Sequence, residues 1–183
     1  KPRLSGANKQ HLKYPYLLTG VVIEDNDQVW AADITYIRMA YGFVYLMVIM
    51  DWFSRFVVAW ELSTSLTADF CIRALEMALN KGLPTIFNTD QGSQFTSEDF
   101  INVLKAHRIQ ISMDGRGRLF DNIFTERLWR SLKYADIYIK DYHLVKEVYQ
   151  GIGQYFEFYN NKRPHQSLSY RTPADVYLRA VIF

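Results

Sequence analysis

The sequence predicts an α/β fold in which a mixed five-stranded sheet is flanked by helices. Three observations support this prediction. Three apolar, β-branched segments follow one another with short connections between residues 28 and 62. Two helical patterns then alternate with two short strand patterns. Hydrophobic residues make up 49% of the 183 residues, so the chain can form one well-cored domain with a tail.

The first three strands are predicted at residues 29–37, 43–50 and 55–62. The first is rich in aromatic and β-branched residues. The second is a continuous apolar run, which suits a strand that is covered on both faces. Because the connections between the three are short, we expect an antiparallel meander.

Helices alternate with strands in the rest of the chain. A strand that follows a helix is expected to pair in parallel, so the last two strands should do so. The predicted elements are a helix capped by Thr67, a strand at 85–89, a helix capped by Ser97, a strand at 109–112, a helix begun by Asp121 and Asn122, and a last helix over 141–161.

Composition excludes several classes of protein. The single cysteine, Cys71, forms no internal disulfide and lies in an apolar helical pattern, which predicts burial. The four histidines are dispersed, so a zinc site is not expected. The start of the chain lacks a signal-peptide pattern, and the longest apolar run, residues 43–50, is less than half of a membrane span. We therefore expect a soluble, intracellular domain without a membrane partner.

Three regions differ in pattern. Residues 1–26 show no periodicity and are read as a basic arm or linker, with four cations and no acid among the first twenty residues. Residues 27–138 hold the predicted core. Residues 139–183 are predicted to form a helix and tail that pack on this core, with the aromatic side chains of residues 155–159 turned inward. The net charge of +2 is nearly neutral, so a nucleic-acid partner must be argued from local clusters of cations.

Three carboxylates stand out by their positions. Asp33 lies inside the first apolar strand, where an ionised side chain is costly unless it is compensated. Asp90 follows directly on the fourth strand, and Glu126 lies in the helix begun at residue 121. Converging carboxylates repel one another unless a hard cation lies between them. Two divalent magnesium or manganese ions could clamp the attacking and leaving oxygens of a phosphodiester.

Each carboxylate also has a structural interpretation. Asp33 could pair with a buried arginine, Asp90 could shape the turn that contains Gly92, and Glu126 could be an exposed helical residue. Pattern and spacing alone leave these alternatives open.

Four segments resemble one known family. Residues 30–36 (WAADITY), 89–97 (TDQGSQFTS) and 121–133 (DNIFTERLWRSLK) are similar to the three catalytic segments of insertion-sequence transposases of the IS-three family, which share their core with retroviral integrases. The tail that begins at residue 159 (YNNKRPHQSL) resembles the closing motif of the family. Residues 91–125 separate Asp90 from Glu126, and this spacing of 35 residues is typical of the group.

The resemblance implies a ribonuclease-H-like fold and a polynucleotidyl transferase. The resemblance also implies that Asp33, Asp90 and Glu126 form a catalytic triad that binds Mg²⁺ or Mn²⁺, with two ions in each active site. Cleavage of one strand would expose a 3′-hydroxyl, and this hydroxyl would attack a target phosphodiester. Residues 113–120 depart from the short Lys-Gly-Asn loop that is common in the family, which puts details of that loop in doubt.

The family also implies partners and a location. Transposon-end and target DNA would be bound by an oligomer, in the nucleoid region of a bacterial cytoplasm. The helix-turn-helix region that recognises element ends is expected to precede the arm at residues 1–26. A ribonuclease-H-like nuclease without strand transfer, and a catalytically incompetent DNA-binding or assembly module, remain alternatives.

Candidate DNA contacts cluster around the third catalytic segment. Glu126, Arg130 and Lys133 are spaced i, i+4 and i+7, so they are expected to share one helix face that can hold a phosphate backbone. An intrahelical pair between Glu126 and Arg130 is the alternative. The full set of candidate DNA-binding residues is Arg130, Lys133, Arg116, Arg118, Gln94, Asn122, Lys162 and Arg163.

Overall fold

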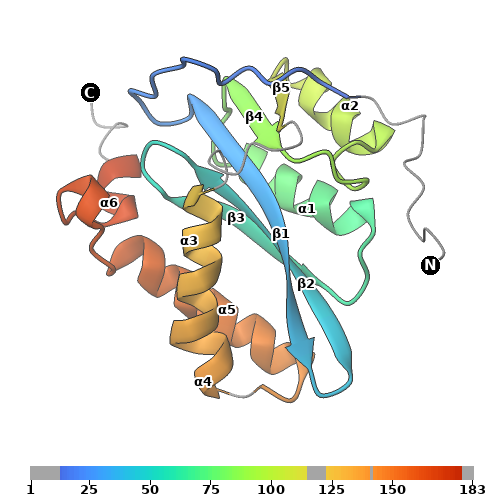
Figure 1. The fold of residues 1–183 in the computed structure, drawn as a ribbon, viewed down its shortest axis with the longest axis vertical. Helices are drawn as coiled ribbons and strands as arrows, with labels where there is room; N and C mark the ends of the chain where they lie inside the picture. The colour runs from blue at the N-terminus through green and yellow to red at the C-terminus, as the bar shows by residue number, and fades with distance from the viewer. Residues whose placement is uncertain (1–12, 115–122, 141, 179–183) are drawn as a thin grey trace, which may run out of the picture.

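The computed structural model describes residues 13–114, 123–140 and 142–178. These residues form a five-stranded sheet with the strand order β3-β2-β1-β4-β5 and helices on its faces, as the sequence predicts (Figure 1). The strands are β1 (Val29–Met39), β2 (Gly42–Asp51), β3 (Val57–Ser63), β4 (Ile86–Thr89) and β5 (Gln110–Met113).

Both predicted kinds of strand pairing are confirmed. β1 pairs with β2 and β2 with β3 in antiparallel fashion, whereas β1 pairs with β4 and β4 with β5 in parallel. The last pair in the β1–β4 ladder joins Ala31 to Asn88. Asp33 and Asp90 each follow this pair by two residues, so the register brings them to the same level of the sheet.

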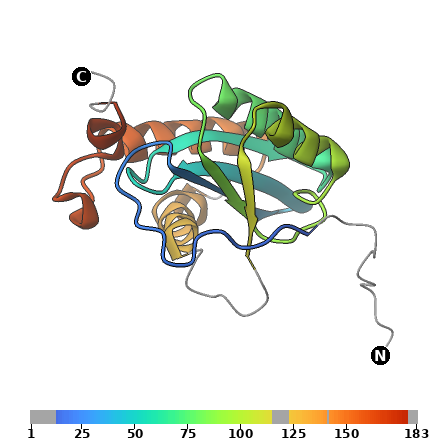
Figure 2. The ribbon, with the colours of Figure 1, turned by 90° about the horizontal axis from the view of Figure 1, so that it is seen from above.

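Two groups of helices cover opposite faces of the sheet. Side chains of β2 alternate between them: Met47 packs with the first group, and Val48 packs with the second. Figure 2 shows α3 on the opposite side of the sheet from α1 and α2. The first group is α1 (Ala68–Leu79) and α2 (Glu98–Ala106), and the second is α3 (Ile123–Leu132), the π-helix η1 (Lys133–Ile137), α4 (Tyr138–Lys140) and α5 (Val145–Asn161).

Helix starts follow the predictions only in part: the last helix, predicted from residue 141, begins at Val145, and the predicted start at Asp121 and Asn122 lies outside the described residues. The hydroxyl of Ser97 accepts a hydrogen bond from Phe100 N at 3.4 Å, which confirms it as the cap of α2. Thr67 occupies the N-cap position of α1, but its side chain makes no capping hydrogen bond. The backbone geometry alone therefore marks the start of α1.

The third strand begins two residues later than predicted. Arg55 has a φ of 64°, in the left-handed region, which a strand cannot contain. The turn before it is fixed by Asp51, whose carboxylate accepts hydrogen bonds from the backbone N and the hydroxyl of Ser54. This turn directs the side chain of Arg55 away from the sheet ladder.

Helix α5 packs on the second face of the sheet through aromatic side chains. Tyr155, Phe156 and Tyr159 are buried there, as predicted. Phe158 was predicted to pack with them, but 47% of its surface is exposed because it lies on the outer side of the helix. Cys71 is fully buried on the inner face of α1, in agreement with its apolar pattern.

The described part of the segment before β1 lies against the core. The carbonyl of Pro15 accepts a hydrogen bond from Met113 N, and Leu17 N donates to the hydroxyl of Ser112. Nearer to β1, a carboxylate oxygen of Asp27 accepts hydrogen bonds from Tyr177 in the C-terminal helix α6 (Pro173–Tyr177) and from the Trp30 indole. These contacts bring residues far apart in the sequence together at the start of β1.

The helices were also searched for apolar stretches. Within residues 13–114, 123–140 and 142–178, no helix has the length and hydropathy that crossing a bilayer requires.

Candidate active site

Two of the predicted catalytic carboxylates lie together. β1 and β4 are parallel neighbours, and their register places Asp33, in the middle of β1, level with Asp90, just after β4. Both side chains line the same cavity of about 160 Å³. Gln94, a predicted DNA contact, lies in its wall and donates to the carbonyl of Leu66 at 3.1 Å. The structure thus brings together residues that are 57 positions apart in the sequence.

Asp90 is exposed and is held by its own turn. Its Oδ1 accepts a hydrogen bond from Gly92 N at 2.8 Å. Asp90 thus shapes its own turn, which was one of the alternatives left open by the sequence. The hydrogen bond uses one of its carboxylate oxygens, and the carboxylate lines the cavity. The structural and chemical roles of Asp90 are therefore compatible.

Asp33 is half-buried and receives a donor from α3. Its Oδ1 accepts a hydrogen bond from Ile34 N, and its Oδ2 accepts one from the indole Nε1 of Trp129 at 2.8 Å. Trp129 is itself buried. Trp129 was not among the predicted site residues, and its one signal in the sequence is an indole donor one helical turn after Glu126.

Glu126 is exposed in the first turn of α3. It lies one turn before Trp129, which ties the helix to Asp33. Among the described residues, no three side chains of His, Cys, Asp or Glu lie close enough to hold a metal ion. The structure therefore brings Asp33 and Asp90 together but leaves Glu126 outside that pair.

The two paired carboxylates nevertheless suit a hard divalent cation. Carboxylate oxygens are the ligands that Mg²⁺ and Mn²⁺ prefer, and Mg²⁺ is commonly bound by one or two carboxylates together with water and phosphate oxygens. Asp33 and Asp90 supply such oxygens at one cavity wall.

Arg130 and Lys133 only partly follow the predicted common helix face. α3 ends at Leu132, and Lys133 begins the π-helix η1. Burial lowers the pKa of Lys133, and the attraction of Asp33 opposes that effect. Arg130 is exposed on α3. Lys133 is thus turned inward toward the carboxylates, while Arg130 faces solvent.

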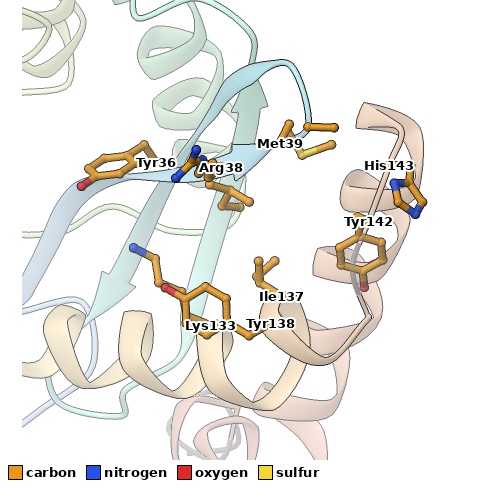
Figure 3. Close-up of a pocket in the computed structure, with 10 residues that line it drawn as sticks. Tyr36, Arg38, Met39, Lys133, Ile137, Tyr138, Tyr142 and His143 are labelled. Carbon is orange, nitrogen blue, oxygen red and sulfur yellow. The ribbon is translucent and has the colours of Figure 1, made fainter.

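Lys133 lies in a second, larger cavity of about 490 Å³. Figure 3 shows it on the helix side, across from the part of β1 that carries Tyr36 and Arg38. Its Nζ lies 5.3 Å from the centre of the Tyr36 ring, and Tyr36 also lines the cavity that holds Asp33 and Asp90. A cationic and aromatic surface therefore adjoins the carboxylates, and such surfaces suit a nucleic-acid strand.

The remaining predicted DNA contacts lie elsewhere. Lys162 is exposed at the end of α5, and Arg163 contacts the hydroxyls of Ser131 and Tyr155 beside α3. Arg116, Arg118 and Asn122 lie outside the described residues.

Comparisons with known proteins match this chain to one family. Two sequence profiles, each described as an integrase core domain, match residues 24–118 and 107–173. The transposase for insertion sequence element IS904 of Lactococcus lactis is 35% identical over 153 residues, which cover 81% of this chain and 60% of that protein. Transposase InsF of insertion sequence IS3A from Escherichia coli is 36% identical over 144 residues, which cover 76% of this chain and 50% of that protein. The chain thus spans between half and two thirds of the length of these relatives.

Solved structures share the fold. A simian T-cell lymphotropic virus intasome, solved in complex with the PP2A regulatory subunit B56 gamma, gives a TM-score of 0.73 at 19% identity, covering 93% of this chain and 60% of the other. The HTLV-2 integrase catalytic core domain, solved in complex with magnesium in a dimeric form, gives 0.66 at 19% identity, covering 84% and 96%. At these identities the likeness shows the fold, which is the ribonuclease-H-like fold of retroviral integrase cores. Since the first profile spans more than half of the chain and the curated relatives are insertion-sequence transposases, the chain belongs to the integrase core domain family, as its resemblance indicated.

Proposed function

We propose that this chain is the catalytic core of a transposase that cuts DNA and joins a 3′-hydroxyl to a target strand, with Asp33, Asp90 and Glu126 as catalytic residues. The observation that carries the proposal is the meeting of Asp33, in the middle of β1, with Asp90, just after the parallel strand β4, in one cavity wall. The similarity to insertion-sequence transposases supports it.

The three carboxylates would hold divalent Mg²⁺ or Mn²⁺, two ions in each site. Bound there, such ions would offset the charge of the carboxylates and of the phosphodiester at its attacked and leaving oxygens. The HTLV-2 core, which shares this fold, was solved in complex with magnesium, and this supports divalent metal use by our chain.

Each chemical step exchanges one phosphorus–oxygen bond for another. In cleavage, a water oxygen bonds to phosphorus, the bond to the 3′ oxygen breaks, and that oxygen takes a proton to become a hydroxyl. In joining, the 3′-hydroxyl oxygen bonds to a target phosphorus and loses its proton, while the 3′ oxygen of the target strand leaves and is protonated. No covalent bond to the protein forms in either step.

Positioning by the chain itself begins with Asp33. Trp129 donates to one of its carboxylate oxygens and Ile34 N donates to the other, so both contacts orient this carboxylate in the cavity wall. The same contact fixes the inner face of α3, the helix that carries Glu126. The triad requires Glu126 to approach the two aspartates, and we propose that DNA binding brings it there.

Cations and one amide beside this cavity would hold the DNA. Lys133 lies next to Tyr36 in the adjoining cavity, where a strand leaving the carboxylates would pass. The other proposed DNA contacts are Arg130, Gln94, Lys162 and Arg163, together with Arg116, Arg118 and Asn122 outside the described residues.

The proposed partners are transposon-end DNA, target DNA and further copies of the chain. The neighbours solved as an intasome and as a dimeric form support assembly on DNA. Residues 1–26 would link this core to a region that recognises transposon ends. Cleavage and joining of DNA would take place at the nucleoid of a bacterial cell.

A strand-transfer assay tests the proposal. The chain is given a pre-cleaved oligonucleotide donor, a plasmid target and Mg²⁺ or Mn²⁺, beside Glu126→Gln and the control Glu98→Gln. Glu98 is the matched control because it is an exposed glutamate in the first turn of another helix, α2. Joined product that needs the metal, is lost in Glu126→Gln and persists in Glu98→Gln is the expected result.

Other outcomes lead to other functions. Hydrolysis of the donor without joining would point to a nuclease. Absence of product, even with an N-terminal region of a relative fused to the chain, would point to a DNA-binding or assembly module and overturn the proposal.

A further inference from the structure

Three arginines from distant segments line a third cavity, of about 160 Å³, beside α3. Arg55 comes from the turn before β3, Arg127 from α3, and Arg163 from the segment after α5. Ser131 and His165 also contribute to its wall. None of the described residues that line this arginine pocket is acidic.

Arg55 is held in place before any ligand arrives. Its left-handed backbone conformation is strained for a residue with a side chain, and such strain persists where the surroundings impose it. Its guanidinium carbon lies 3.3 Å from the centre of the Phe124 ring, a cation–π contact. Asp51 attracts it, but the Asp51 oxygens already accept hydrogen bonds from Asp27 and Ser54, and Asp51 does not line the pocket.

The pocket is electrostatically unbalanced. Burial, together with the like charge of Arg127, lowers the pKa of Arg55 to about 10, with Tyr159 and Asp51 acting in the opposite direction. Burial and the charges of Arg163 and Arg55 lower the pKa of His165 to about 4, so its ring is neutral at pH 7. An anion between the guanidinium groups would relieve this repulsion.

One polar side chain that lines the pocket, His165, has an unsatisfied atom. The Nε2 atom of His165 is buried and has no hydrogen-bond partner among the described residues. A buried nitrogen of this kind is costly unless it is satisfied, and a neutral imidazole can donate from Nε2 to an anionic oxygen. Arg127 also lines a shallow groove with Arg130 and Tyr134, so the pocket continues along the outer face of α3.

We propose that the arginine pocket binds one backbone phosphate of the DNA on which the core acts. Guanidinium groups present paired donors that match phosphate oxygens, and a phosphate is small enough for the pocket. Arg127 directly follows Glu126 in the chain, so a phosphate held here would fix the duplex at a set distance from the catalytic end of α3. This inference rests on the proposed function, because it takes DNA as the ligand.

Arg127→Gln is the test variant, with Arg73→Gln as its control. Arg127 is exposed, so its loss should leave the fold intact, whereas Arg55 and Arg163 are packed against neighbouring side chains. Arg73 is an exposed helical arginine outside the pocket that pairs with Glu61. Binding of labelled duplex DNA is measured without divalent metal over a range of salt concentrations. The slope of log K against log salt should be about 1 smaller in magnitude for Arg127→Gln and unchanged for Arg73→Gln.

A second arm locates the phosphate. Duplexes are prepared in which one phosphate at a time is replaced by an uncharged methylphosphonate. At one position the replacement should weaken wild-type binding and have no further effect on Arg127→Gln. In a third arm, inorganic phosphate should raise the melting temperature of the wild type more than chloride does at equal ionic strength, and this difference should shrink in Arg127→Gln.

Each outcome decides the proposal. Stabilisation by inorganic phosphate without any coupled position in the DNA would mean that the pocket holds a free anion, which overturns the proposal. Equal salt slopes for both variants and the wild type would also overturn it. DNA binding through Arg127 in a chain that never joins strands would instead refute the proposed function and leave the phosphate pocket standing.

Discussion

The indole Nε1 of Trp129 donates a hydrogen bond of 2.8 Å to Oδ2 of Asp33. This contact joins the helix that carries one proposed catalytic residue to the strand that carries another. A hydrogen bond to a carboxylate is stronger than one between neutral groups, and it restricts the rotation of the side chain. We regard Trp129 as a positioning residue that acts through Asp33.

Trp129→Phe should reduce strand joining by about tenfold, because loss of a group that orients a metal-binding carboxylate commonly has effects of 10- to 100-fold. The Asp33 carboxylate would rotate more freely and bind the metal less tightly. Thermal stabilisation by Mn²⁺, measured as a function of metal concentration, should therefore require more metal in the variant.

Trp60→Phe is the control for that variant. Trp60 is a half-buried indole that packs on Tyr149 and Phe156, away from the carboxylates. An equal loss of metal response in both variants would show that Trp129 matters only for packing.

Gly92→Ala should lower joining activity by about 10- to 100-fold while changing the free energy of unfolding by less than about 0.5 kcal/mol. A Cβ atom at residue 92 would lie 2.9 Å from Oδ1 of Asp90. The short carboxylate can move aside at little cost in stability, but it would leave its orientation toward the cavity. Joining rates and chemical denaturation measure the two effects, and a variant with full activity would show that the orientation of Asp90 is unimportant.

Gly151→Ala should destabilise the fold by about 1–3 kcal/mol, as overpacking commonly does. A Cβ atom there would overlap the hydroxyl and ring of Tyr142, and that hydroxyl donates to the buried carboxylate of Asp136 at 2.6 Å. Calorimetry should show a fall in melting temperature that is smaller when the same change is made in Tyr142→Ala. An equal fall in melting temperature in the wild type and in Tyr142→Ala would show that the Tyr142 side chain is not the source of the strain.

Acid should destabilise the protein partly through His165. Its folded pKa of about 4 lies below the ordinary value of 6.5, so between these values the unfolded chain binds a proton that the folded chain does not. The contribution of His165 to the free energy of unfolding is therefore fully present above about pH 6.5 and is lost as the pH falls toward 4. After allowance for solvent screening we expect about 1 kcal/mol, or about 2–4 °C in melting temperature, between pH 7 and pH 5. His165→Gln should lose less over that range, and an unchanged pH dependence would contradict this account.

Much of the fold follows from patterns within single segments. Residues 46–50 of the predicted apolar run are buried on both faces of the sheet in β2, although Phe43 at its start is exposed. The alternation of helices and strands gives the two parallel pairings. The left-handed conformation at Arg55 is not visible in such a pattern, because it depends on the Asp51–Ser54 contacts that shape the turn. Phe158 was misplaced for a related reason: an apolar residue type does not tell which side of a helix the sheet covers.

The candidate site was predictable only in part. The parallel pairing of β1 with β4 was predictable, and their register then places Asp33 level with Asp90, although Asp33 lies in the middle of its strand and not at its end. Trp129 could not be assigned, because its donor role depends on how α3 sits over β1. The arginine pocket likewise joins residues from three segments, and the distance between Arg55 and Arg163 in the chain gives no sign of it.

The central place of β1 also has a consequence for the order of folding. β1 and β2 are joined by a tight turn and can pair early. β4 follows β3 and α1 in the chain, so its pairing with β1 closes a much longer loop. Contacts that close long loops are slow to form. Asp33 therefore belongs to a hairpin that can form early, whereas Asp90 reaches the sheet later. A nascent chain that has not finished folding would lack the proposed metal-binding pair and, with it, the proposed cleavage of DNA.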